Sequence, residues 1–173
     1  MFNCVPEDCS TILLRTAGEV LYVKFSFLND LIEGRADSGK LEDLQILGRT
    51  GWTQIISVSR RKLWEGEPLF HVSTRSGKLS LTGEHRVALR RGGREVVLPV
   101  REIGAGDALL ARPPSKIRGG KPVLDAGAPL QAVGILSMER ATGYTGYVYE
   151  LETGDHWFFA NDFLVHDLCY NQD

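Results

Sequence analysis

The sequence lacks the features of several common protein classes. It has only three cysteines, Cys4, Cys9 and Cys169, an odd number without the paired spacing of a disulfide framework or a zinc site. It has no apolar run of about 18 residues, and Met1-Phe2-Asn3-Cys4 lacks the charged and apolar regions of a signal peptide. We therefore expect a soluble, cytoplasmic protein with no membrane partner.

An excess of charge of one sign is also missing. The chain has 20 Lys and Arg residues against 22 Asp and Glu residues, a formal net charge of −2. No whole-chain field therefore draws it to nucleic acid or anionic lipid. A small basic cluster has no interleaved aromatic residues, so we interpret it as the solvated face of a hairpin and expect no nucleic-acid partner. Its members are Arg86, Arg90, Arg91 and Arg94.

What the sequence does contain is short, glycine-bounded segments of strand-like composition, with little helical periodicity. They predict an all-β protein, and 173 residues with 43% hydrophobic content suffice for one domain or a compact two-lobed unit, which we expect to be monomeric. The predicted strands are residues 20–25, 52–58, 69–74, 78–81, 87–89, 95–100, 131–138 and 147–151, and a strand pair at 157–165 around Asn161-Asp162.

Other segments are predicted to be turns, short helices or linkers. Gly92-Gly93 predicts a hairpin turn, because glycine tolerates the positive φ of a tight turn, and residues 73–78 predict a second hairpin. Residues 27–33 and 100–103 are candidates for short helices. Residues 112–129, rich in Pro and Gly, predict a loop or flexible linker before the C-terminal strands. No internal repeat is obvious.

Cys4 is a candidate nucleophile for the peptide bond that precedes it. Its thiolate can attack the Asn3 carbonyl, which converts the amide into a thioester and frees an amine. Because amides resist this attack, the site must protonate the leaving nitrogen and stabilise the oxyanion. Thr82 and His85, in Thr82-Gly83-Glu84-His85, have suitable side chains, although such short motifs recur by chance. Cys9 is interpreted as a small buried hydrophobe.

Three features in order carry a family resemblance: Cys4 near the start, Thr82-Gly83-Glu84-His85 midway, and the tail with His156, His166 and Asp167. Together they resemble the inteins, self-splicing domains of the Hint fold, over nearly the whole chain. The resemblance implies an all-β, horseshoe-like fold with pseudo-twofold symmetry and both junctions in one cleft. It also implies that the flanking host segments, the exteins, are covalent partners and that no metal or organic cofactor is required.

The same resemblance predicts how the chain is divided. Residues 1–3 correspond to an N-extein remnant, 4–167 to the intein domain and 168–173 to a C-extein remnant. In inteins, the region that corresponds to 112–129 holds a homing endonuclease or a split site. Here it is far too short for an endonuclease, so the chain is similar to a mini-intein.

The resemblance further implies three steps: an N-to-S acyl shift at Cys4 helped by Thr82 and His85, transfer of the thioester, and cyclisation with cleavage after residue 167. His156 and His166 are expected to polarise the peptide bond after residue 167 and to protonate its leaving amine. Glu150 stands where inteins usually have Asp or Cys, and its carboxylate is expected to relay protons or orient the Cys4 thiol.

The end of the tail departs from the family pattern. Asp167 replaces the usual Asn, and its carboxylate would form a strained anhydride, so we expect slower cyclisation. Leu168 occupies the acceptor position but cannot accept an acyl group, whereas Cys169 is a candidate acceptor one residue later. Three alternatives stay open: a splicing intein, a Hint domain that cleaves without ligation, and a non-catalytic β module.

Overall fold

The computed structural model describes residues 5–6, 11–34, 43–113, 116–118, 121–123 and 128–167. These residues are mainly antiparallel strands, which confirms the predicted all-β class. The strands are β1 (Val5–Pro6), β2 (Thr11–Thr16), β3 (Glu19–Lys24), β4 (Gln45–Gly48), β5 (Gly51–Lys62), β6 (Leu69–Thr74), β7 (Gly77–Thr82), β8 (Arg86–Arg91), β9 (Arg94–Pro99), β10 (Ala108–Ala111), β11 (Lys116–Arg118), β12 (Lys121–Val123), β13 (Gln131–Ala141), β14 (Tyr147–Thr153), β15 (Trp157–Ala160) and β16 (Phe163–His166). The short helices are η2 (Phe25–Leu28), α1 (Asn29–Ile32) and η3 (Val100–Glu102).

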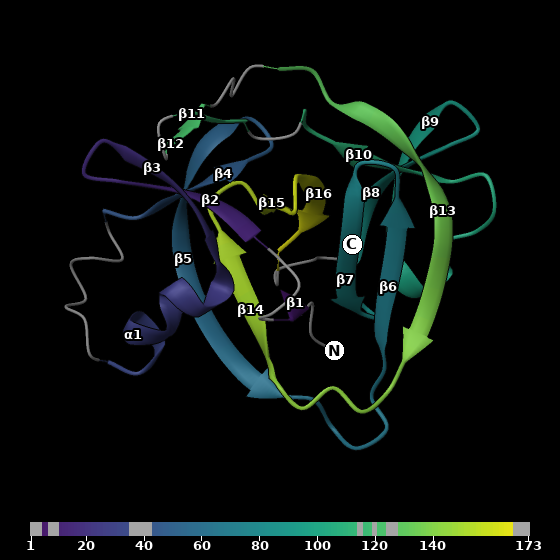
Figure 1. Cartoon of the computed structure of the whole chain (residues 1–173), viewed down its shortest axis with the longest axis horizontal. Helices are drawn as coiled ribbons and strands as arrows, with labels where there is room; N and C mark the ends of the chain where they lie inside the picture. Colours follow the sequence, from purple (N-terminus) through teal and green to yellow (C-terminus); the bar gives the residue numbers. More distant parts are fainter. Residues whose placement is uncertain are drawn as a thin grey trace.

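The strands form two large sheets in a horseshoe-like outline, with the long strands β5 and β13 in its two arms (Figure 1). The first sheet has the order β1-β14-β5-β4-β2-β3. The second has the order β15-β16-β8-β10-β13-β6-β7, and β9 pairs with β8. The hairpin β15–β16 lies between the two arms, so the C-terminal part of the described chain is central in the molecule (Figure 1).

The strand orders show the predicted pseudo-twofold relation. Read from β7 to β9, the second sheet is β7-β6-β13-β10-β8-β9, which matches the first sheet position by position. The match follows chain order, with β1 to β6 as one run and β7 to β14 as the other, if the separate pair β11–β12 is left out. The last strand of each run, β6 or β14, sits in the sheet of the other run. This exchange joins the two halves.

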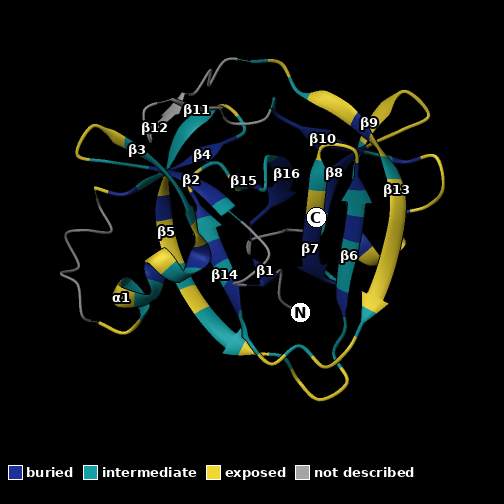
Figure 2. Ribbon diagram, in the orientation of Figure 1, coloured by how far each residue is buried: buried dark blue, intermediate teal, exposed yellow. Residues whose placement is uncertain are grey.

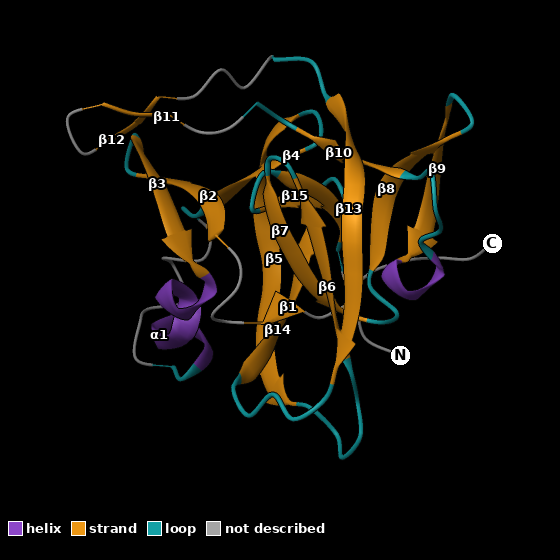
Figure 3. Cartoon of the chain, turned by 45° about the vertical axis from the view of Figure 1, so that its right-hand side comes forward, coloured by secondary structure: helices purple, strands orange, loops and turns teal. Residues whose placement is uncertain are grey.

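The hairpins β2–β3 and β8–β9 show why the two halves fold alike. Their turns, Ala17-Gly18 and Gly92-Gly93, have positive φ at both central residues, with values of 49° and 77° in the first and 57° and 78° in the second. This conformation matches the twist of the flanking strands in two-residue hairpins. Each hairpin leads into a 3-10 helix, η2 or η3, on opposite sides of the molecule (Figure 3).

The core lies on the inner faces of both sheets, where buried residues concentrate (Figure 2). Leu14 and Leu89, at matching positions of β2 and β8, are both fully buried. An aromatic group joins the first half to the tail, because the Phe25 ring lies 5.4 Å from that of Tyr149 and 6.0 Å from that of Phe158. Aromatic pairs at these separations add to the free energy gained from burial.

Most of the predicted strands and both helical segments are present, with some bounds shifted. The predictions missed the short strands β1, β2, β4 and β10. The prediction that 112–129 is a loop or linker was wrong for part of that stretch, because β11 and β12 pair antiparallel through backbone hydrogen bonds there. Within the described ranges, no helix has the length and apolarity needed to span a membrane.

Candidate functional site

The hairpin β15–β16 brings the tail beside the middle of the chain. Asn161 and Asp162 have positive φ, 50° and 68°, and form the predicted turn between the two strands. β16 then pairs with β8, with Val165 opposite Val87, and with the end of β10. Since β8 follows directly after Thr82-Gly83-Glu84-His85, this pairing carries the end of the tail to that motif.

His85 connects the two motifs directly. The residue is buried, and its backbone N–H donates to the Thr82 carbonyl at 3.0 Å, which closes the turn after β7. Its Nε2 lies 2.7 Å from the His166 carbonyl oxygen. A carbonyl oxygen only accepts, so Nε2 carries the proton of this hydrogen bond. Thr82, also buried, ends β7 at the start of the same turn.

The Asp167 carboxylate is fixed at the end of the described tail. Its Oδ2 accepts a hydrogen bond from the Thr153 backbone N–H at 2.9 Å and lies 3.2 Å from the His156 Nδ1. The Asp167 backbone N–H donates to the His156 carbonyl at 2.9 Å. Asp167 is completely buried, whereas the side chain of His156 is 51% exposed. The histidine therefore connects a buried carboxylate with solvent.

His166 contacts the peptide group that ends the described chain. Its Nδ1 lies 3.3 Å from the Asp167 carbonyl oxygen, to which the ring donates. Burial, more than any other factor, lowers the pKa of His166 below its ordinary value, and the nearby His156 and Arg86 lower it further, against an opposing effect of Asp167. At neutral pH the ring is therefore uncharged. It lies parallel to the His156 ring at a centroid distance of 6.2 Å.

Two residues that sequence reasoning missed hold this arrangement, Thr153 and Asp155. His156 has a φ of 68°, which is unusual for a large side chain. Asp155 holds the turn, because its Oδ1 accepts from the Trp157 N–H at 2.9 Å and its own N–H donates to the Thr53 hydroxyl at 3.0 Å. The turn-forming composition of Thr153-Gly154-Asp155 was the available signal.

The structure places Glu150 beside a basic residue. Its Oε1 lies 3.5 Å from the Nε of Arg61, which also forms two hydrogen bonds with Glu67, at 2.7 and 2.8 Å. Glu150 follows Tyr149, which pairs with Val5 of β1. Glu150 therefore lies on the strand that pairs with β1, and β1 begins one residue after Cys4, the residue on which Glu150 is predicted to act. Cys4, Leu168 and Cys169 themselves lie outside the described residues, and so does Cys9.

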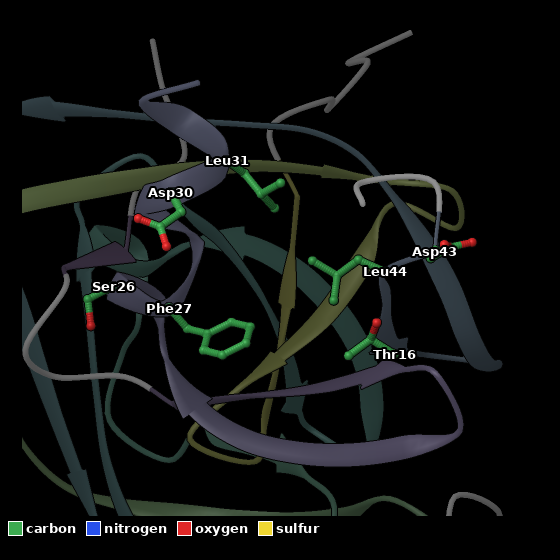
Figure 4. A pocket seen from close by; sticks show the side chains of 7 residues that line it. All are labelled: Thr16, Ser26, Phe27, Asp30, Leu31, Asp43 and Leu44. Carbon is green, nitrogen blue, oxygen red and sulfur yellow. The ribbon is translucent and has the colours of Figure 1, made fainter. Parts of the chain in front are cut away.

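A separate pocket of about 510 Å³ lies next to α1 and the end of β2 (Figure 4). It contains none of the predicted site residues. Phe27, Leu31 and Leu44 form its apolar part, and Asp30 and Asp43 lie at its edges. Among the described residues, no group of three or more His, Cys, Asp or Glu side chains is placed to hold a metal ion.

Comparison with known proteins identifies the fold. No model of a known protein family matches the sequence, and no curated protein matches it. Among solved structures, a transcription factor IIB Mvu mini-intein has a TM-score of 0.73 and 18% identity, covering 96% of this chain and 100% of that one. The chain has the fold of inteins. A KlbA intein precursor from Methanococcus jannaschii has a TM-score of 0.70 and 14% identity, with 99% and 94% coverage, respectively.

A DnaB intein from Synechocystis sp. PCC 6803 is similar too, with a TM-score of 0.62 and 18% identity, covering 96% of this chain and 99% of that one. Such full coverage of both chains means that the present chain corresponds in extent to a mini-intein. In this fold, His85, His156, His166 and Asp167 form one connected group. The domain limits and catalytic roles expected from the sequence stay predictions.

Proposed function

We propose that this chain is a self-processing domain of the intein type, which breaks the peptide bonds before Cys4 and after Asp167. The main support is the 2.7 Å contact between His85 Nε2 and the His166 carbonyl oxygen. It joins the motif expected to act at the first junction to the tail expected to act at the second. A β module without chemistry has no need for this group of histidines around a buried carboxylate.

The first step is an acyl shift at Cys4. The Cys4 thiolate attacks the Asn3 carbonyl carbon, the C–N bond breaks, and the Cys4 nitrogen takes up a proton as the thioester forms. Support comes from β1, which begins one residue later and lies against β7, the strand that ends at Thr82. Since His85 donates through Nε2, its Nδ1 holds the lone pair in a neutral ring and suits proton transfer.

The last step is cleavage after Asp167. A carboxylate oxygen of Asp167 attacks its own carbonyl carbon, a cyclic anhydride forms as the C–N bond to Leu168 breaks, and the leaving Leu168 nitrogen takes up a proton delivered by His156. The Nδ1–H of His166, 3.3 Å from that carbonyl oxygen, stabilises the developing oxyanion. Oδ2 is held by the Thr153 N–H and by the His156 Nδ1, so Oδ1 is the oxygen that attacks. The step is slower than amide attack by Asn.

A second candidate function is cleavage without ligation, as in other Hint processing domains. One sequence observation favours it: Leu168 has no group that accepts an acyl chain. Ligation then depends on Cys169, one residue beyond the usual acceptor. Displacement of a reacting atom by about 1 Å can reduce a rate roughly a hundredfold, so transfer to Cys169 is the least favoured step.

The test uses the full chain with a different tag at each end, incubated with and without dithiothreitol. Intact mass spectrometry and gels then follow the products. Thiol-dependent loss of the N-terminal tag, blocked by Cys4→Ala, is the expected result, and an unchanged mass of the unsubstituted chain contradicts the proposal. A joined tag-to-tag product indicates splicing, whereas separate fragments indicate cleavage alone.

A further inference from the structure

A groove outside the histidine group begins at Thr82. It has a volume of about 370 Å³, and Thr82 and Gly83 lie at one end of it. Its apolar lining comes from Trp64, Pro68 and Phe70, which lie before and at the start of β6. Because Leu69 pairs with Thr82 across β6 and β7, these residues have a fixed place next to the predicted acyl-shift motif.

Local contacts fix the positions of the Phe70 and Trp64 rings on the two sides of the groove. A Cβ on Gly83 would lie 2.9 Å from the Phe70 ring, so the absence of a side chain lets this ring pack over the motif. On the other side, the Trp64 ring stacks under the Arg61 guanidinium at 4.2 Å. The Trp64 N–H also donates to Glu67 at 3.0 Å. Trp64 nevertheless stays 54% exposed, which is unusual for so large an apolar residue.

Four charged side chains line the groove, Glu67, Glu84, Arg101 and Arg140, and the first three lie in ion pairs. Glu67 accepts two hydrogen bonds from Arg61 besides the one from Trp64, and Glu84 accepts one from Arg101 at 2.8 Å. The aromatic walls favour an apolar occupant, because a polar group placed against them would lose hydration without gaining a partner, while the exposed Arg140 keeps its own hydration. The groove is therefore suited to a large apolar side chain of a peptide.

Chain connectivity indicates which peptide. Val5 pairs with Tyr149, and β1 lies against β7, so the residues that precede Val5 start beside the strand that ends at Thr82. An extended chain advances about 3.3–3.6 Å per residue, which puts Phe2 within roughly 11 Å of Val5. Phe2 is also the aromatic residue of the N-terminal segment.

We propose that this groove binds the residues preceding Cys4 and selects a large apolar side chain two positions before it, Phe2 in this chain. The inference rests on the proposed function, since it describes the polypeptide that the first junction acts on. Binding there holds the Asn3 carbonyl against the thiolate. Binding energy from a remote side chain thereby speeds the reacting step.

The first experiment is a double-mutant cycle on thiol-induced cleavage before Cys4 in the full chain. Phe2→Ala and Trp64→Ala are each expected to slow it about tenfold, and the double variant no more than either single variant. Phe27→Ala is the matched control. Phe27 is an exposed aromatic residue that lines the separate pocket of Figure 4, and its replacement should change the rate less than about twofold. Single effects that multiply to about a hundredfold overturn the proposal.

A second experiment does not need the reaction. In the Cys4→Ala chain, nuclear Overhauser contacts between the Phe2 ring and the Trp64 indole are expected, and Gly83→Val should weaken them by displacing Phe70. If these contacts are present but the unsubstituted chain shows no thiol-induced cleavage, the groove stands and the proposed function fails. If cleavage proceeds while the contacts are absent, the groove proposal is overturned.

Discussion

The two halves of the molecule share a strand plan, but they differ in what is attached to them. Strand β2 of the first half pairs with β3 and β4, and its counterpart β8 pairs with β9 and β10 in the same way. Among the described strands, β16 of the hairpin β15–β16 pairs outside the hairpin only with the second-half strands β8 and β10. The repeated plan therefore provides a scaffold, and the added hairpin supplies His156, His166 and Asp167.

The added hairpin is bound to both halves through its turn. The Asn161 Oδ1 accepts hydrogen bonds from the backbone and the hydroxyl of Thr11, at 2.8 and 2.9 Å. Its Nδ2 donates to the Lys78 carbonyl at 2.9 Å, and the neighbouring Asp162 pairs with Arg112 at 3.1 Å. A hairpin held at its far end keeps its other end, with His166, in register with His85.

The largest expected effect tests whether the two halves are one unit. Leu14→Ala and Leu89→Ala remove matching, fully buried side chains, so each should lower the free energy of unfolding by about 3 kcal/mol. Urea unfolding should stay a single transition in both variants, because β6 and β14 are exchanged between the halves. Two separate transitions would show that the exchange does not couple them.

A slightly smaller effect, on the rate of cleavage before Cys4, tests the chemical role proposed for His85 in the second half. His85→Ala should slow thiol-induced cleavage before Cys4 about a hundredfold, the usual order for a lost acid–base group. His71→Ala is the control, since this strand residue contacts Ser80 on β6–β7 and has no place in the proposed mechanism. Equal rates for both variants would remove His85 from the mechanism. Rates come from intact mass spectrometry over time.

The next largest effect concerns the contacts that the hairpin turn makes with the two halves. Asn161→Ala loses the hydrogen bonds to Thr11 and Lys78 and replaces Asn, which tolerates positive φ, with Ala, which tolerates it less, so a loss of about 2 kcal/mol is expected. Asn161→Gly keeps the backbone conformation accessible and separates the two causes. Thermal unfolding measures both, and an Asn161→Gly chain as stable as the parent would mean that the hydrogen bonds contribute little.

The matching hairpin turns offer a more sensitive comparison. Ala17 and Gly92 occupy the same turn position with φ of 49° and 57°. Ala17→Gly should therefore stabilise the first hairpin, and Gly92→Ala should destabilise the second, each by about 1 kcal/mol. Chemical denaturation resolves changes of this size, and shifts of the same sign for both substitutions would contradict the shared turn conformation.

The smallest effect concerns pH. Because burial lowers the pKa of His166 below its ordinary 6.5, the unfolded chain takes up this proton at higher pH than the folded chain. Stability should rise with pH from the lowered pKa up to about 6.5, and His166→Gln should flatten that rise. Urea midpoints between about pH 5 and 7 measure it. An unchanged slope in His166→Gln would exclude this histidine as the cause.

Predictions from the sequence were best where local chemistry dominates. The hairpin turn at Gly92-Gly93 and the strands around Asn161-Asp162 have strong turn residues, and both are where they were expected. Strand β4 and strand β10 were missed, because each is only four residues long and gains its place by pairing with distant strands. Thr153 was missed as a site residue for a similar reason, since it acts through a backbone N–H that every residue except proline has.

The sequence on its own established the β class and the tight turns and indicated the candidate reactive groups, because dihedral preferences and side-chain chemistry belong to single residues. The sequence did not reveal the repeat of the two halves, because the matched hairpins share few identical residues. The identical pairs are Leu14 and Leu89, Arg15 and Arg90, and Gly18 and Gly93. Folding alone decided that β6 and β14 change sheets and that His85 contacts His166. These outcomes depend on pairing between strands far apart in the chain, and the free energy of such pairing resides in neither segment by itself.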